Sequence, residues 1–472
     1  SPMKAPRQPL ARAILVAVLA GSLGACATLS SDGGEGEVRA QASRLMGQET
    51  RPQAMSAETR AQRRDELLAQ PLRVEDAVAL ALINNPGLQR AFAELRLTEA
   101  EVVAATRLRN PRISVARLTQ GDEREIERSI TFDLIGLLTL PARAPLEKQR
   151  LESAKLDTTR AVLNLARETR RSYFAAVAGA QRARYATDVQ AAAEAGRDLA
   201  RSLAQAGNIS RLDAAREQAF YAAATAQRAR AETEALAARE RLIRLLGVMD
   251  ADTVKLPESL PELPGTPREL NQVEQQALDQ RIDVQMAKRN ADNTARALRL
   301  TKVTRFINVL NLGYEYNTSN ELPKQTGFEV SLELPLFDFG SARVAQAEAI
   351  YRRSLAQVAE TAVNARSESR DAYTRYRTAY DLSRHYRDEI VPLQKQISDE
   401  VLLRYNGMLI STFELLAQAR DQVASTDAYL ATLEDFWVAE ADLTSTLQGA
   451  GGGMSPPARA ATMTTDAAAA GH

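Results

Sequence analysis

Apolar and polar residues alternate along two pairs of short segments, one pair in each half of the chain. In the second half the apolar positions are Leu310, Leu312, Tyr314 and Tyr316, followed after a polar loop by Phe328, Val330, Leu332 and Leu334. In the first half they are Ile113 and Val115, followed by Ile126, Ile130, Phe132 and Leu134. Because the side chains of a strand point alternately to its two faces, this period predicts four β-strands, each with one apolar face.

The opposite face of these strands is polar or acidic and includes Glu315, Glu329 and Glu333. Two interpretations fit: a soluble sheet with one wet face, or strands of a transmembrane barrel whose polar face lines a lumen. The barrel is favoured, although Arg128 falls on the apolar face and counts against it. Loops are expected at residues 119–125 and 317–327. Four strands cannot close a barrel, so several chains would have to contribute.

The remainder of each half has the composition and spacing of helices. Two long helices are expected at 142–206 and 342–406, each about 100 Å long at 1.5 Å per residue. Helices of about half that length are expected at 74–109, 212–246, 268–305 and 412–447. Two of the shorter helices laid end to end match one long helix, so each half offers two full-length rods.

Small residues with a 3-4 spacing form a seam on the second long helix: Leu355, Val358, Ala362, Ala365, Ser369, Ala372, Tyr376 and Ala379. This spacing is typical of a coiled coil, and small side chains let two helix backbones approach closely. A helical scaffold protein without a channel would show the same seam. The expected fold class is therefore mainly α with a small membrane β part.

The two halves are copies of one unit. Residues repeat at an offset of 200: Asn164, Glu168, Arg170 and Tyr173 return as Asn364, Glu368, Arg370 and Tyr373, and Ala142, Arg143 and Gly207 as Ala342, Arg343 and Gly407. Upstream the offset is 196, and the terminal glycines Gly247 and Gly449 differ by 202. A constant offset over so many residues predicts a duplicated strand-strand-long-helix unit.

The N-terminus carries a targeting pattern. Basic residues precede a short apolar run and the sequence Leu23-Gly24-Ala25-Cys26, which holds the only cysteine of the chain. This resembles the bacterial lipobox, in which the cysteine is lipidated, with palmitate among the acyl groups, after the signal peptide is cleaved. No later segment is apolar enough for a transmembrane helix, so any deeper entry into a membrane would use the strands.

These patterns give an expected domain organisation. It comprises a signal peptide (1–25), an N-terminal lipidated extension (26–71), a first repeat (72–256), a proline-rich surface linker (257–267), a second repeat (268–448) and a disordered tail (449–472).

Composition argues against nucleic-acid binding and catalysis. Lys plus Arg and Asp plus Glu both number 60, so there is no excess of positive charge for a nucleic acid. The two histidines, His385 and His472, and a cysteine expected to be lipidated supply neither a nucleophilic triad nor a Cys/His metal site. We therefore expect no enzyme activity, cofactor or metal.

The duplicated unit resembles the TolC-type outer-membrane efflux proteins. The likeness rests on the duplication, on Leu334-Pro335-Leu336-Phe337-Asp338-Phe339-Gly340 leading into the second long helix, and on the turns at Gly207 and Gly407. The first repeat lacks the Phe-Asp-x-Gly turn at residues 135–141. The resemblance implies a trimer with a 12-stranded β-barrel and an α-barrel reaching into the periplasm. The lipobox matches the lipoprotein branch of the family, anchored in the outer membrane of Gram-negative cells.

The two glycine turns are the candidate functional tips. Each has a glycine for the bend, Gly207 or Gly407, and a serine as plausible helix N-cap, Ser210 or Ser411. A plain helical hairpin would explain these residues. The resemblance implies that the turns instead dock the periplasmic adaptor protein of an inner-membrane pump of the RND type. Three copies of Asp213 and Glu414 would then border a closed aperture, and the strand carboxylates would face the lumen.

Overall fold

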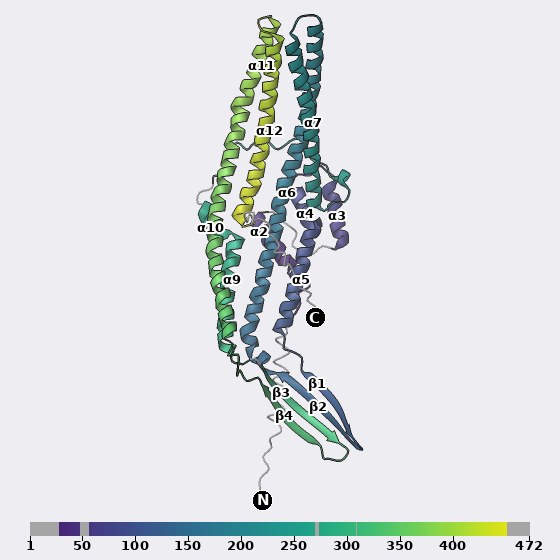
Figure 1. Ribbon diagram of the computed structural model, residues 1–472, viewed down its shortest axis with the longest axis vertical. Coiled ribbons are helices and arrows are strands. Elements are labelled where there is room, and N and C mark those ends of the chain that lie inside the picture. The colour runs from purple at the N-terminus through teal and green to yellow at the C-terminus, as the bar shows by residue number, and fades with distance from the viewer. Residues whose placement is uncertain (1–27, 48–55, 270–272, 308, 451–472) are drawn as a thin grey trace, which may run out of the picture. The chain divides into compact units, whose positions relative to one another are not determined.

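The chain folds into long helices and one small antiparallel sheet (Figure 1). The computed structural model describes residues 28–47, 56–269, 273–307 and 309–450. Contacts divide it into two compact units. The first takes the described residues up to Val38 together with Ala91–Thr158 and Gln285–Glu360. The second takes Arg39–Arg90, Thr159–Val284 and the described residues from Thr361, so each unit draws on both sequence repeats.

All four predicted strands are present. They are β1 (Arg112–Gln120), β2 (Glu123–Asp133), β3 (Leu310–Ser319) and β4 (Gln325–Leu332). Neighbouring strands pair antiparallel in the order β1-β2-β3-β4. The central pair, β2 with β3, joins one strand of each repeat, so the sheet requires both copies. Within the described chain, β1 and β4 each have one unpaired edge.

The loops between paired strands are shorter than predicted. Pairing continues from Gln120 to Glu123 and from Asn317 to Gln325, so polar residues expected in the loops lie in strands. Gly121, at φ 62°, closes the first hairpin in a two-residue turn, a geometry in which glycine adopts positive φ without steric cost. Polarity at a strand end therefore did not mark the end of pairing.

The first long helix, α6 (Leu134–Gln205), starts immediately after β2, eight residues before the predicted Ala142. The Gly136 amide donates to the Asp133 carboxylate at 2.9 Å, which satisfies one of the free amides of the first turn. The second repeat differs, because Gly340, at φ 73°, delays the helix until Ser341. There the rod runs through α10 (Ser341–His385), a π-helical turn η2 (Tyr386–Ile390) and α11 (Val391–Asn406).

Two of the four shorter helices are continuous and two are broken. Both α7 (Arg211–Leu246) and α12 (Thr412–Gln448) match the prediction. The segment 74–109 is instead split into α4 (Val74–Asn84) and α5 (Pro86–Thr106), and 268–305 into α8 (Val273–Gln280) and α9 (Ile282–Thr304). Pro86 explains the first break, since it lacks an amide hydrogen and forces Asn85 into an extended conformation.

The helix ends pack against these breaks. Gly247 ends α7 and Gly449 ends α12, both with positive φ. An added Cβ would lie 2.5 Å from the Asn84 carbonyl oxygen at Gly247 and 2.7 Å from the Ile282 nitrogen at Gly449. Only glycine combines the left-handed conformation with so close an approach.

Aromatic side chains form the core of the second unit. Phe174 stacks on Trp437, whose ring is in turn in edge contact with Phe436, and Tyr376 and Tyr380 both pack against Phe436. The single tryptophan of the chain thus packs in an interface between helices. These rings are contributed by α6, α10 and α12.

The proline-rich linker is an extended strap bound to this core. Its Leu260 and Leu263 are buried. The Trp437 indole donates to the Pro261 carbonyl at 3.0 Å, and the Tyr380 hydroxyl donates to that of Pro264 at 2.8 Å. The Leu260 amide also donates to the Gln181 side chain of α6 at 3.1 Å, so the linker contacts helices of both repeats.

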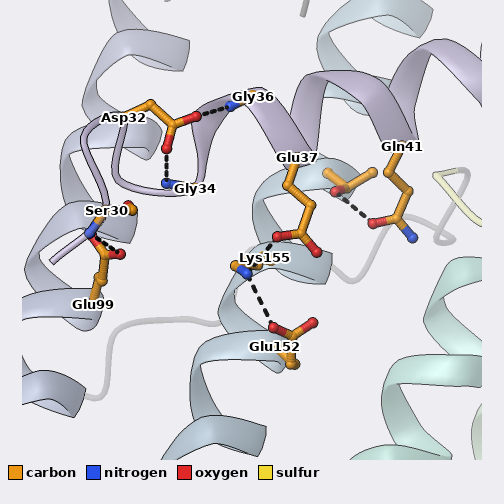
Figure 2. Close-up of polar contacts among 10 residues, drawn as sticks. Ser30, Asp32, Gly34, Gly36, Glu37, Gln41, Glu99, Glu152 and Lys155 are labelled. Atoms are coloured by element: carbon orange, nitrogen blue, oxygen red, sulfur yellow. Dashed lines mark hydrogen bonds and ion pairs between the residues drawn. The ribbon is translucent and has the colours of Figure 1, made fainter. Parts of the chain in front are cut away.

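Residues 28–47 of the N-terminal extension include α2 (Glu35–Met46) (Figure 2). The Asp32 carboxylate accepts the amides of Gly34 and Gly36, which hold the pKa of Asp32 below its usual value. Lys155 of α6 donates to Glu37 at 2.6 Å and to Glu152 at 3.0 Å. The extension is thus tied to the first unit by polar contacts. Residues 57–68 form a further short helix, α3 (Ala57–Leu68).

A buried ion-pair cluster holds the break between α8 and α9. The Arg281 side chain is 1% exposed, and its Nη2 lies 2.7 Å from the carboxylates of both Asp283 and Glu368. Its Nη1 donates to the Ala365 carbonyl at 3.3 Å. One guanidinium thereby joins the helix break to α10.

Replacing Arg281 with Met should strongly destabilise the protein, because two carboxylates would lose the buried guanidinium that they share. Breaking a buried pair by removing one partner costs about 3–5 kcal/mol. A matched control is Arg366→Met, which breaks a 2.6 Å pair with Glu274 whose arginine is 57% exposed, where a loss below about 1 kcal/mol is expected. Urea denaturation midpoints of the two variants measure the difference. Equal losses would show that the cluster contributes nothing beyond a surface pair.

Candidate functional site

The first tip turn joins α6 to α7 in a tight, fully capped loop. Gly207, at φ 78°, follows the last residues of α6, and the Asn208 amide donates to the Leu203 carbonyl at 2.8 Å. The Ser210 hydroxyl oxygen accepts the Asp213 amide at 3.0 Å, which confirms Ser210 as the N-cap of α7. Hydrogen bonds therefore satisfy helix ends on both sides of the turn.

The second tip turn repeats this geometry with a different residue at the bend. The Leu409 amide donates to the Arg404 carbonyl at 2.8 Å, and the Ser411 hydroxyl oxygen accepts the Glu414 amide at 3.2 Å, so Ser411 caps α12 as predicted. The left-handed residue is Met408, at φ 59°, while Gly407 has φ −80°. The expectation that Gly407 makes the bend is therefore wrong.

The two turns correspond at an offset of 201, one more than the offset of the long helices. Gly207 matches Met408, and Ser210 matches Ser411. The extra residue lies upstream in η2, where the Val391 amide donates to the Tyr386 carbonyl five residues earlier. A π turn absorbs one additional residue within a helix. Pro392, which has no amide to offer the carbonyl four residues before it, stands two residues after the turn.

The burial of residues along the two rods confirms that the offset changes from 200 to 201 at η2. In α6 the buried alanines after the aromatic core are Ala186, Ala193 and Ala200. The positions 201 residues later, 387, 394 and 401, are among the least exposed of η2 and α11. Before η2, Thr169 and Ser369 are both fully buried at an offset of 200. The π turn thus keeps the same face of both rods turned inward.

The two candidate gate carboxylates lie in the first turn of α7 and α12. Asp213 accepts the Ser210 hydroxyl at 2.7 Å and lies 3.6 Å from Arg216. Glu414 is exposed at the equivalent place in the second turn. Capping and the neighbouring Arg216 therefore account for the local contacts of Asp213. The positive end of the helix dipole also stabilises both carboxylates.

A buried ion pair near the tips was not predicted from the sequence. Glu217 of α7 is 3% exposed, and Arg420 of α12 donates to it at 2.7 Å. The Arg420 guanidinium lies over the rings of Phe220 and Phe413 at 5.7 and 5.8 Å. This contact ties the hairpin of the first repeat to that of the second. Acidic and basic residues are frequent on both helices, so no sequence signal distinguishes this pair.

Farther along α12, burial raises the pKa of Glu434, partly offset by the charge of Arg182. The carboxyl lies where helices of the two repeats approach each other. Among the described residues, no group of three or more His, Cys, Asp and Glu side chains is arranged to hold a metal ion.

The register of the sheet separates its two faces. The apolar face carries the rows Leu310/Leu332, Phe132/Leu312/Val330 and Ile113/Ile130/Tyr314/Phe328. The polar face carries Asp133/Asn311/Ser331, Thr131/Gly313/Glu329 and Ser129/Glu315/Gly327. Glu315 and Glu329 therefore share the polar face. Glu333 lies one residue beyond β4.

Arg128 does lie on the apolar face, in a row with Val115, Tyr316 and Thr326. Its guanidinium lies 5.7 Å from the centre of the Tyr316 ring and donates to the Thr318 hydroxyl at 3.2 Å. This row is on the hairpin side of the purely apolar rows. The charge thus falls at the margin of the apolar band, where it is tolerated.

The predicted lipidation site, Cys26, lies outside the described residues, as does the part of the tail from residue 451. No described helix combines the length and the apolar character that crossing a membrane requires.

Solved structures share this fold. A membrane protein from Pseudomonas aeruginosa is 18% identical, with a TM-score of 0.69 over 80% of this chain and 90% of that chain. The Campylobacter jejuni CmeC outer membrane channel is 16% identical, with a TM-score of 0.67 over 80% and 86%. The outer-membrane channel OprN is 20% identical, with a TM-score of 0.67 over 82% and 92%. No protein-family model and no curated protein matches the sequence significantly. The chain therefore has the fold of outer-membrane channel proteins, which confirms the predicted resemblance.

Substitutions at the two tip glycines should differ sharply in their effect. Gly207→Ala places a Cβ in a left-handed conformation and should cost about 1 kcal/mol. Gly407→Ala, at a negative φ, should be neutral or slightly stabilising. Hydrogen exchange of the turn amides measures the local effect. A loss of protection at Gly407→Ala equal to that at Gly207→Ala would contradict the assigned turn geometry.

Proposed function

We propose that the protein is an outer-membrane channel, the exit duct through which a pump and its adaptor discharge substrates to the cell exterior. It conducts passively, as one component of a tripartite efflux or export system. The lipid on Cys26 anchors it to the outer membrane of a Gram-negative cell, and its helices extend into the periplasm.

The sheet is the observation that carries this proposal. One face is a continuous apolar surface with Val330 and Phe328 exposed, and the other carries the carboxylates of Glu315 and Glu329. Both outer edges lack strand partners within the described chain. A homotrimer would supply 12 strands, enough to close a barrel with lipid outside and a wet, acidic lumen inside. Glu333 continues the acidic series at the lumen's periplasmic end.

The shared fold supports the same role, since CmeC and OprN are outer-membrane channels. Their likeness covers 80% and 82% of this chain.

The tips are the proposed site of partner contact and gating. Turns containing Gly207 with Ser210, and Gly407 with Ser411, dock the periplasmic adaptor, which couples the duct to an inner-membrane pump of the RND type. Asp213 and Glu414, each repeated three times, border the aperture. A ring of carboxylates attracts cations and resists its own closure, so it acts as both a selectivity element and part of a gate.

A helical scaffold of the periplasm without a channel is the alternative. The long hairpins and their capped turns would serve that role equally. The strands separate the two, because a scaffold has no need of an extended apolar face exposed on the sheet.

Val330→Glu should abolish outer-membrane assembly, because it places a charge at the centre of the lipid-facing surface. The control, Ser331→Glu, adds the same charge to the adjacent residue on the polar face and should assemble normally. Membrane fractionation and heat-resistant oligomer bands measure assembly. Normal assembly of Val330→Glu would favour the scaffold.

Asp213→Asn should weaken cation preference while leaving the tip folded, because the amide oxygen still accepts the Ser210 hydroxyl. Ser210→Ala removes the cap and keeps the charge, so it separates capping from electrostatics. Reversal potentials in planar bilayers measure selectivity. Unchanged conductance and cation preference in Asp213→Asn would remove Asp213 from the aperture.

A further inference from the structure

A cavity lies within the second compact unit, between the hairpin α6/α7 and helix α12. Its volume is about 240 Å³, and all three helices contribute to its wall. We call it the seam cavity. Because α6 and α7 belong to the first repeat and α12 to the second, the cavity exists only while the two hairpins are packed together. It is smaller than the roughly 300 Å³ at which sites for drug-sized ligands begin, so it suits a smaller molecule.

Small side chains create the space. The wall includes five residues with little or no side chain: Gly179, Ala186, Ala224, Ala231 and Ala424. At one end α6 and α7 approach closely, because an added Cβ at Gly179 would lie 3.2 Å from the Ala235 Cα. At the other end the buried pair of Glu217 and Arg420 joins α7 to α12. The cavity is therefore bounded at both ends along the helices.

The apolar part of the wall suits an aromatic ligand. It includes the rings of Tyr185 and Phe220 and the side chains of Val189 and Val423. Burial raises the pKa of Tyr185, so its hydroxyl stays protonated and neutral. Contacts between aromatic rings add to the stabilisation that burial of apolar surface provides. A flat aromatic group therefore matches this surface.

The charges at the wall favour a cation. Arg182 lies 3.4 Å from the Asp427 carboxylate, and Arg420 lies 2.7 Å from the Glu217 carboxylate, so each guanidinium has an acidic partner. Glu234 also lines the cavity and forms no ion pair with another described residue. One carboxylate is thus left at the wall without a paired cation.

The side of the cavity that carries this carboxylate is open to solvent. Gln227, Glu234 and Ala424 line the cavity and are exposed. A cationic group bound there meets the Glu234 carboxylate, while the apolar part of the same molecule reaches Tyr185 and Val423. Burial of the apolar part would supply most of the affinity, and the charge would fix the orientation.

We propose that the seam cavity binds a small aromatic ammonium compound and that this ligand holds the two hairpins together. A ligand that binds only the packed state stabilises that state by mass action. Binding itself does not depend on the proposed function. Its effect on the channel rests on that function, because the hairpins carry the tip turns that are proposed to border the aperture.

Calorimetric titration of the purified full-length protein with phenyltrimethylammonium tests the site. Saturable binding at one site per chain is expected. Tetramethylammonium, which has the charge but no ring, should bind at least about tenfold more weakly. Ala424→Leu adds a larger side chain at the open side and should abolish binding. Equal affinity in folded Ala424→Leu would overturn the site, as would the absence of saturable binding when a neighbouring copy fills the cavity.

Glu234→Gln tests the charge, and it serves alone where Ala424→Leu does not fold. It should lower the affinity for phenyltrimethylammonium about fivefold, the upper range for an exposed charge pair. The control is Glu232→Gln, which removes an equal charge from the same helix at a residue that pairs with Arg228 outside the cavity wall. Equal losses in the two variants would overturn the assigned recognition of the cation.

Recordings in planar bilayers test the effect on the channel separately. Phenyltrimethylammonium at ten times its Kd should lengthen the closed times of the unmodified channel about tenfold and leave those of Ala424→Leu unchanged. Binding without any change in closed times would overturn the hold on the hairpins. A protein that binds the ligand but forms no channel would support the site while contradicting the proposed function.

Discussion

Unpaired backbone groups along β1 and β4 are the constraint on which the rest of the structure depends. Among the described residues the four-stranded sheet pairs only internally, so its first and last strands each leave a row of amides and carbonyls without strand partners. In the proposed channel the exposed apolar face beside them meets lipid, and in lipid each unsatisfied group costs several kcal/mol. Closure with other copies of the chain resolves both demands at once. In that proposal the sheet of a single chain is incomplete.

The helices follow from the same arrangement. Because β2 and β3 come from different repeats, the sheet holds the two long rods side by side at its base. The rods then need matching faces along their length. A one-residue insertion in the second rod would rotate the inward face by about 100° about the helix axis. The π turn at Tyr386–Ile390 accommodates the extra residue, so the inward face is restored before the tip. Both tips consequently present the same capped turn.

Sequence patterns predicted the elements whose formation depends on neighbouring residues, namely the strands and the capped turns. Alternation located all four strands, and serine N-caps located both tip turns, since each signal lies within a few residues. The break before Pro86 is signalled by the proline itself, but the helical periodicity of residues 74–109 led to the prediction of one continuous helix. No local sequence signal marks the break at Arg281, because the ion pair that holds it involves Glu368, which is distant in sequence. The bend was assigned to Gly407 rather than Met408, because the residue types of the second rod do not reveal the one-residue insertion upstream. The Glu217 and Arg420 pair was equally invisible.

Disulfide cross-linking between the two edge strands tests the central claim most directly. A cysteine replaces Ser114 in β1 and, in separate variants, each of Gln325, Gly327, Glu329 and Ser331 in β4, which samples the unknown register between chains. Closure of three copies predicts a cross-linked ladder in outer membranes that ends at three times the monomer mass. A ladder that continues beyond three, or no cross-link in any variant, would contradict a closed trimeric barrel.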